Sequence, residues 1–546
     1  MDRSNDWWKR AVIYQIYPRS FCDSNGDGIG DIPGILSKLD YLQYLGADAL
    51  WLSPVYPSPQ YDNGYDVADY RGVDPIFGTM SDLELLIGEA GRRGIRIIMD
   101  LVLNHSSDEH PWFRRACASR EDPCHDYYIW RDRIPQEEDA PEQAGFGYGS
   151  WKWVPGVRQY YYYQFSERQP DLNWANPALR QELYSMINWW VDKGVGGFRL
   201  DVVDHLGKDP ERRVKVNGPR LHELIREMSA AAFRRPGLVT VGEAWSATTD
   251  RARLYSAPDG SELSMVFQFE HILLDQAADG DKWDLAPLSL PRLKQTLAKW
   301  QRELHGRGWN SLFWENHDLP RIVSRWGDDG AYRELSAKML AVLLLTMEGT
   351  PYIYQGQELG MTNIRLGLDE YQDVETLNMF RDRRREGWTE AQLLRAAHAK
   401  SRDNARTPMQ WSAGENAGFT SGEPWLKVNP NYPEINAEDQ VGRDGSVCEC
   451  YRRLIRLRRE YPVFTDGDFE LLLPEDEDLF AFTRSDPEAR LLAVCNFHGR
   501  TVADPLTDRE QGMTLLYCSY GEGGSRTQLR PYEARVFWQA LTEGGK

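Results

Sequence analysis

Polar side chains follow four apolar runs of this 546-residue chain, each at the point where the run ends. The groups that could do chemistry there are three carboxylates, two imidazoles and one guanidinium: Asp201, Glu243, Asp318, His105, His317 and Arg199. One carboxylate can attack an anomeric carbon while a second protonates the leaving oxygen, which is the chemistry of glycoside hydrolysis. For any one of these residues a structural ion pair is the alternative, but six of them at such positions favour a catalytic site.

Two of the carboxylates have neighbours that would set their charge. Arg199 stands two residues before Asp201, so the two side chains lie on the same face of an extended segment. We expect this cation to keep Asp201 ionised, because a nearby opposite charge favours the charged form. Glu243 precedes Ala244 and Trp245, whose apolar surface would let Glu243 hold a proton as a general acid.

Short β-rich runs alternate with amphipathic helical stretches over the first four hundred positions, and these elements would place the six residues. The strand candidates are 11–17, 49–52, 95–102, 197–203, 238–243, 266–269, 311–314 and 351–354. The helices expected between them include 35–45, 81–93, 177–193 and 219–233. This alternation predicts an α/β fold, and eight units predict a closed (β/α)8 TIM barrel. The carboxyl ends of barrel strands share one mouth, so the six residues would converge there.

Two segments break the alternation. Residues 105–173 are rich in Trp, Tyr, Gly and charge and are predicted to form an inserted subdomain after the third strand. From residue 469 the chain turns to short β runs, which predicts a C-terminal β-sandwich domain over 469–546. The barrel would then comprise 1–104 and 174–468.

Composition excludes several classes of function. The chain has 83 acidic and 64 basic residues, a formal net charge of −19 that argues against binding to nucleic acid or an anionic membrane. Seven cysteines without paired spacing indicate no disulfide framework, and no apolar run is long enough to span a bilayer. We expect a monomer in a reducing cytoplasm whose partner is an oligosaccharide substrate.

One loop has the pattern of a cation site. Residues 23–31 read D-x-N-x-D-G-x-x-D, with candidate oxygen ligands at alternate positions and a Gly for a sharp turn. The candidate metal ligands are Asp23, Asn25, Asp27, Ile29 and Asp31. The helix-loop-helix calcium pattern is incomplete, because its twelfth position is Gly34 rather than Glu. The ion would be Ca²⁺ with Mg²⁺ as the alternative, and a turn without an ion remains open.

Five motifs carry a resemblance to a known family. DLVLNH, GFRLD, GEAW and ENHD resemble the four conserved motifs of the α-amylase superfamily, glycoside hydrolase family thirteen. QPDLN, at 169–173, is similar to a further motif of its oligo-1,6-glucosidase group. The similarity spans nearly the whole chain and is strongest to glucan 1,6-α-glucosidases. The family carries a structural calcium in the loop after its first strand, which the resemblance implies for 23–31.

The resemblance implies a role for each motif residue. Asp201 would be the nucleophile and Glu243 the acid/base, while Asp318 would bind sugar hydroxyls. The residues that would hold sugar are Asp62, Tyr65, His105, Arg199, Trp245, His317, Glu375 and Arg402. Pairing of Arg402 with Asp62 would close the pocket, which implies exo action with retained anomeric configuration.

Val202, next to the expected nucleophile, is the residue that goes with α-1,6 linkages in this family, whereas Ala or Thr goes with α-1,4 linkages. The alternatives left open are an α-1,4-glucosidase, a trehalose-6-phosphate hydrolase and a sucrose-isomerising transglucosylase. A phosphorylated substrate would need a basic residue near the leaving group, which the sequence does not place. A non-catalytic sugar-binding relative is disfavoured, because the catalytic carboxylates are all present.

Overall fold

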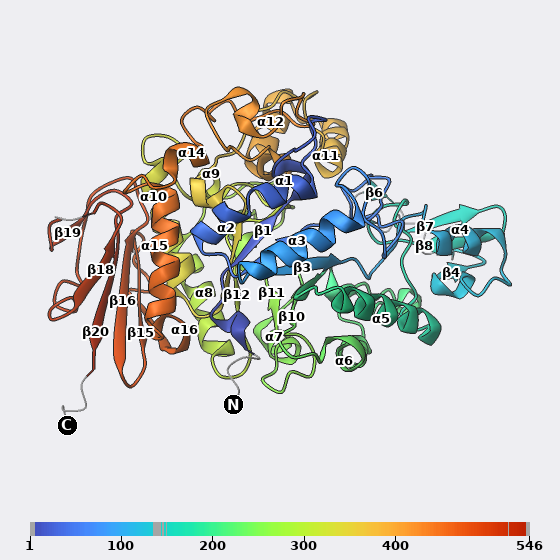
Figure 1. Ribbon diagram of the computed structural model, residues 1–546, viewed down its shortest axis with the longest axis horizontal. Coiled ribbons are helices and arrows are strands. Elements are labelled where there is room, and N and C mark those ends of the chain that lie inside the picture. The colour runs from blue at the N-terminus through green and yellow to red at the C-terminus, as the bar shows by residue number, and fades with distance from the viewer. Residues whose placement is uncertain (1–5, 135–142, 145–146, 149, 522–523, 542–546) are drawn as a thin grey trace.

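The computed structural model describes every residue except 1–5, 135–142, 145–146, 149, 522–523 and 542–546. Part of the predicted insertion therefore lies outside the described residues. The fold class is confirmed: a parallel eight-stranded barrel stands at the centre, with helices around it and antiparallel sheets at the C-terminal end (Figure 1).

All eight predicted strands form and pair in parallel. They are β1 (Ile13–Ile16), β2 (Ala49–Leu52), β3 (Arg96–Leu101), β9 (Gly197–Leu200), β10 (Val239–Glu243), β11 (Met265–Phe267), β12 (Ser311–Leu312) and β13 (Thr350–Tyr354). The sheet closes through a parallel bridge between Val266 and Asn310, beside β11 and β12. Most of these strand residues are buried, because side chains fill the barrel interior on one face and helices cover the other.

Helices cover the outside of the barrel. They are α1 (Ile32–Ser37), α2 (Leu39–Leu45), α3 (Met80–Arg92), α5 (Pro177–Asp192), α6 (Leu221–Met228), α7 (Thr249–Tyr255), α8 (Leu290–Leu304) and α10 (Arg333–Thr346). Helix α5 begins where the sequence predicts, because Asn176 accepts from the backbone N–H groups of Ala178 and Leu179. Two expectations differ from the structure. The helix 35–45 is two helices that meet at Lys38, and 219–233 begins at Leu221 and ends in a π-helical turn, Ser229–Phe233.

Further helices follow the last strands. They are α9 (Ile322–Trp326), α11 (Val374–Arg385), α12 (Glu390–Lys400), α13 (Asp403–Arg406), α14 (Ala437–Gln440), α15 (Val447–Glu460) and α16 (Val463–Asp466). Among them, α15 and α16 pack toward the C-terminal sheet. Within the insertion, α4 (Pro111–Ala118) packs beside an antiparallel sheet of β4 (Trp130–Arg131), β7 (Trp151–Val154) and β8 (Gln159–Tyr162). The two-stranded ladder β5 (Gln143–Ala144) and β6 (Gly147–Tyr148) also belongs to the insertion.

The C-terminal region is a five-stranded antiparallel sheet with a two-stranded ladder beside it. Its strands are β14 (Asp468–Leu472), β15 (Leu479–Ser485), β16 (Ala489–Asn496), β18 (Thr514–Cys518), β20 (Ala534–Ala540) and the pair β17 (Val502–Ala503) and β19 (Gln528–Leu529). Helix α10 lies between this sheet and the barrel and is buried almost throughout (Figure 1). This position explains the unbroken apolar run 339–345 of the helix, because a helix segment covered on both sides has no polar face.

Candidate active site

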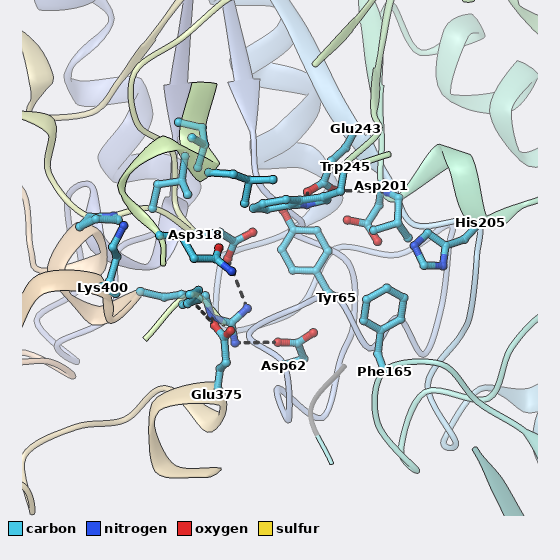
Figure 2. A pocket seen from close by; sticks show the side chains of 18 of the residues that line it. Asp62, Tyr65, Phe165, Asp201, His205, Glu243, Trp245, Asp318, Glu375 and Lys400 are labelled. Atoms are coloured by element: carbon cyan, nitrogen blue, oxygen red, sulfur yellow. Dashed lines mark hydrogen bonds and ion pairs between the residues drawn. The ribbon is translucent and has the colours of Figure 1, made fainter. Parts of the chain in front are cut away.

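A cavity of about 350 Å³ opens at the carboxyl ends of the barrel strands (Figure 2). Nine of the eleven predicted catalytic and sugar-binding residues line it: Asp62, Tyr65, His105, Asp201, Glu243, Trp245, Asp318, Glu375 and Arg402. The other two, Arg199 and His317, are buried and contact lining residues from beneath. The structure therefore brings the predicted set together in one place.

Arg199, on β9, joins the two carboxylates at the centre of the cavity. Its Nη1 donates to Oδ1 of Asp201 across 2.8 Å and to Oδ1 of Asp100 across 2.7 Å. Its Nη2 donates to Oε2 of Glu243. One buried cation thus holds the side chains of Asp201 and Glu243 toward each other, as a nucleophile and an acid/base must be held.

Several groups act on the pKa of Asp201. Burial raises its pKa well above the ordinary value, and the neighbouring carboxylates of Glu243 and Asp100 add to the rise. Arg199 opposes this increase but does not cancel it. Arg199 therefore favours the ionised form of Asp201, as predicted, but it acts against burial and two further anions, because three carboxylates share a single buried guanidinium.

The cavity floor is closed by ion pairs between segments that are distant in sequence. Nη2 of Arg402 lies 3.5 Å from Oδ1 of Asp62, and its Nη1 lies 3.3 Å from Oδ1 of Asp318. Arg406 also donates to Asp318 across 2.7 Å. Burial works against ionisation of Asp318, but the charges of Arg402 and Arg406 hold its pKa well below the ordinary range. Asp318 is thus a permanent anion, suited to accepting sugar hydroxyl groups.

His317 is held in one tautomer by its neighbours. The hydroxyl of Tyr65 donates to the Asp100 carboxylate across 3.0 Å, so at 2.7 Å it accepts a hydrogen from Nε2 of His317. Nδ1 of His317 accepts from the side-chain amide of Gln15 across 2.8 Å. Burial lowers the pKa of His317, and that of His105, to about 3. Both imidazoles are therefore neutral groups that bind through hydrogen bonds.

Trp245 and Glu375 lie toward the opening. Trp245 is 41% exposed, and its ring stacks on Phe269 with the ring centroids 3.8 Å apart. Its Nε1 donates to Oε1 of Glu243 across 2.9 Å. Glu375, from α11, pairs with Lys282 and lies 3.6 Å from Nε of Arg402. An exposed ring and an ion pair at the mouth can contact a second sugar unit.

Val202 has an unusual backbone for a β-branched residue. Strand β9 ends at Leu200 rather than at residue 203, and Val202 adopts φ 35° and ψ 51° in the left-handed region. L-residues with a branched Cβ seldom adopt this conformation, which costs about 1–3 kcal/mol. Val202 forms part of the cavity wall next to Asp201 in the chain.

Ten further lining residues are absent from the predicted set: Phe165, His205, Ile272, Leu273, Gln276, Lys282, Leu319, Pro320, Arg325 and Lys400. Most come from loops, where no hydrophobic period marks a residue as inward-facing. The sequence could have indicated His205 and Phe165 as lining residues, because each stands a few residues from a predicted motif.

None of residues 23–31 belongs to the cavity lining. Its polar side chains form successive local turns: Asp23 accepts from the N–H of Asn25, Asn25 from that of Asp27, and Asp27 from that of Ile29, each across 2.9 Å. Asp31 caps α1 by accepting from the N–H of Gly34. Over the part of the chain that the structure describes, no three His, Cys, Asp or Glu side chains gather closely enough for a metal ion. An ion here would also need the Asn25 amide oxygen and backbone carbonyl groups as ligands.

Comparison with known proteins agrees with this geometry. Residues 15–467 match the family described as "Alpha amylase, catalytic domain". The chain is 49% identical to an oligo-1,6-glucosidase of Halalkalibacterium halodurans, over 98% of this chain and 99% of the relative. It is 51% identical to a glucan 1,6-alpha-glucosidase of Streptococcus pneumoniae, over 93% of each chain.

The fold is likewise that of solved relatives. The crystal structure of Bacillus licheniformis trehalose-6-phosphate hydrolase superposes with a TM-score of 0.93 at 44% identity, covering 98% of this chain and 100% of the other. This superposition extends over both the barrel and the C-terminal sheet.

Proposed function

Because the chain belongs to the alpha-amylase family, we propose that it is a retaining, exo-acting α-glucosidase. Its substrates would be isomalto-oligosaccharides or dextran, cleaved at α-1,6 bonds from the non-reducing end. The observation that carries this proposal is the buried Arg199, which holds Asp201 and Glu243 together beneath a pocket closed by Asp62 and Arg402. The relatives named for α-1,6 activity support the choice of bond.

Each carboxylate has one chemical task in this mechanism. The Asp201 carboxylate attacks the anomeric carbon while Glu243 gives its proton to the glycosidic oxygen, so the glycosidic bond breaks, the leaving sugar departs as an alcohol and a glucosyl ester forms on Asp201. Glu243 then takes a proton from water, the water oxygen attacks the same carbon and displaces the Asp201 carboxylate, and the two inversions give net retention. The Asp318 anion accepts hydroxyl hydrogen bonds from the glucose throughout.

A phosphorylated disaccharide is the second candidate substrate, because three basic residues line the cavity wall: Lys282, Arg325 and Lys400. Each of these cations is already paired with a carboxylate. Lys282 pairs with Glu375, while Arg325 and Lys400 pair with Asp275 at 2.7 and 2.6 Å. The three cations share two carboxylates, so one net positive charge remains at this wall, and a phosphorylated disaccharide stays the second candidate.

Glucose release from isomaltose and maltose, compared as kcat/KM under one condition, tests the proposal. A tenfold preference for isomaltose, equal to about 1.4 kcal/mol of transition-state stabilisation, is the expected result. A preference for maltose would overturn the linkage. Proton NMR of the first product should show α-glucose before mutarotation, and initial β-glucose would overturn the retaining mechanism.

We further propose a structural Ca²⁺, or alternatively Mg²⁺, at the loop 23–31, on the alternating oxygen groups of that loop. The melting temperature of chelator-treated protein should rise with added CaCl₂. In the variant Asp27→Ala it should not respond, whereas an equal response in both proteins would contradict the site.

We also propose that the protein works as a monomer in the cytoplasm, bound to neither nucleic acid nor membrane. All seven cysteines are unpaired, as suits a reducing compartment. Of the described helices, none has the length and apolar character needed to span a membrane. Light scattering at micromolar concentration should give the mass of one chain.

A further inference from the structure

His205 lines the cavity but has no part in the mechanism above. It ends a short 3-10 turn, Val203–His205, that follows the strained Val202. Its ring lies beside that of Phe165, with centroids 5.4 Å apart, and its side chain is 17% exposed. In Figure 2 His205 and Phe165 lie to the other side of Asp201 from Asp318 and Glu375.

The proton of the His205 ring is assigned by a chain of hydrogen bonds. The side-chain nitrogen of Gln164 donates to the carbonyl oxygen of Lys215 across 3.1 Å. A carbonyl can only accept, so the amide of Gln164 turns its oxygen toward Nδ1 of His205, 2.7 Å away. Nδ1 must therefore carry the hydrogen.

This assignment leaves Nε2 of the neutral ring as a hydrogen-bond acceptor. The groups that face the ring keep it neutral: burial lowers the pKa of His205 to about 3, and the charges of Lys208 and Lys215 add to this effect. Nε2 lies 3.8 Å from Oδ1 of Asp204, too far for a hydrogen bond. That oxygen is itself buried and without a donor among the residues that the structure describes.

Nε2 of His205 thus stands at the wall of a sugar pocket with no donor among the described residues, and a second acceptor, Oδ1 of Asp204, is buried 3.8 Å behind it. Buried polar atoms normally have a hydrogen-bond partner, and a sugar hydroxyl supplies the missing kind of group. The terminal glucose would occupy the floor made by Asp62, Asp318 and Arg402, so a hydroxyl beside His205 belongs to the departing part of the substrate.

We propose that Nε2 of His205 accepts a hydrogen bond from a hydroxyl group of the leaving sugar, which makes His205 a specificity-determining residue for carbohydrate leaving groups. The inference rests on the proposed function and adds the chemical feature by which the enzyme recognises the second sugar. Gln164 is then a positioning residue, since it acts on the sugar only through the tautomer of His205.

Two matched variants and two substrates test the proposal. His205→Met keeps the length of the side chain without an acceptor, whereas His205→Gln can place an amide oxygen near the position of Nε2. Isomaltose has a leaving sugar, and 4-nitrophenyl α-glucoside offers the same terminal glucose with a leaving group that has no hydroxyl. kcat/KM is measured for all combinations.

His205→Met should lower kcat/KM about three- to tenfold on isomaltose, the worth of one neutral hydrogen bond, and less than twofold on the nitrophenyl substrate. His205→Gln should recover most of the loss. Gln164→Met, which frees the tautomer, should give a smaller loss on isomaltose alone. Equal losses on both substrates, or none on isomaltose, would overturn the inference.

The outcome for the wild-type enzyme separates this inference from the proposed function. If the wild type prefers maltose, the linkage is wrong and the same comparison is made with maltose as the disaccharide. If the wild type cleaves no glucoside at all, the two proposals fall together. If it cleaves isomaltose but the variants show no substrate-dependent effect, only the role of His205 fails.

Discussion

Arg199 and Asp201 face each other two residues apart at the end of β9, with Nη1 of the arginine 2.8 Å from Oδ1 of the aspartate. The same guanidinium also binds Asp100 and Glu243. Of these three anionic partners, Asp201 and Glu243 line the cavity and Asp100 does not. This difference separates the residues that would touch substrate from the one that only fixes Arg199.

Asp201→Asn should abolish glucose release while preserving sugar binding. The amide keeps an oxygen for Arg199 but cannot form the glucosyl ester, so we expect kcat to fall by about 10³-fold or more. Glucose release and a sugar-induced rise in melting temperature measure the two properties. Asp100→Asn is the matched control, since it should cost far less activity. A variant Asp201→Asn with wild-type turnover would contradict the nucleophile assignment.

Asp62 should make stability fall as the pH rises between about 4 and about 6. Burial raises its pKa in the folded protein to about 6, although Arg402 opposes this rise. The folded state then binds more protons than the unfolded chain above the ordinary pKa of about 3.9, so stability is lost as the pH rises through this window. The melting temperature of Asp62→Asn minus that of the wild type should grow over the window by about 1–3 °C and then stay constant.

Asp373 gives the control of opposite sign. It binds Arg402 across 2.7 Å, and its pKa is held well below the ordinary range despite burial. The variant Asp373→Asn should therefore be less stable than the wild type by a constant amount from pH 5 to 7. A Tm difference for Asp62→Asn that shrinks as the pH rises would contradict the sign given for Asp62.

The positions of the catalytic groups could be predicted from sequence because a barrel is a regular object. Once eight alternating units are recognised, every strand's carboxyl end lies at one mouth, and Asp201, Glu243 and Asp318 must lie near each other. Their charge states could not be predicted in the same way. The pKa of Asp201 depends on how many anions share Arg199, which sequence spacing does not reveal.

The loop residues show a second limit of prediction from the sequence. Lys282 lies between β11 and α8 in a stretch without periodicity, so nothing in the sequence points it toward Glu375, 93 residues away. The left-handed backbone at Val202 is also unforeseen, because β-branched residues ordinarily extend a strand. Both features arise from tertiary packing that overrides local preference, and both are at the cavity.

Val202→Thr should move the bond preference toward maltose. Thr keeps the branched shape that the strained backbone holds in the wall, but it adds a hydroxyl beside the leaving sugar. We expect the ratio of kcat/KM for isomaltose over maltose to fall about tenfold, with Val202→Ala falling in the same direction. Turnover of 4-nitrophenyl α-glucoside should stay within about twofold. An unchanged ratio would show that Val202 does not select the bond.

The pair Lys282 and Glu375 should act as a unit at the cavity mouth. Lys282→Met leaves Glu375 to interact with Arg402 alone, 3.6 Å away. Glu375→Gln removes the carboxylate that pairs with Lys282. The double variant removes both charges, so its loss in kcat/KM on isomaltose should be smaller than the sum of the single losses. Since both side chains are partly exposed, we expect a coupling energy of about 0.5–1 kcal/mol.

Arg383→Met, which breaks ion pairs to Asp281 and Asp284 outside the cavity, is the control and should leave kcat/KM unchanged. Additive single losses would mean that the two residues contact the sugar independently, and the ion pair would then have no role in binding it.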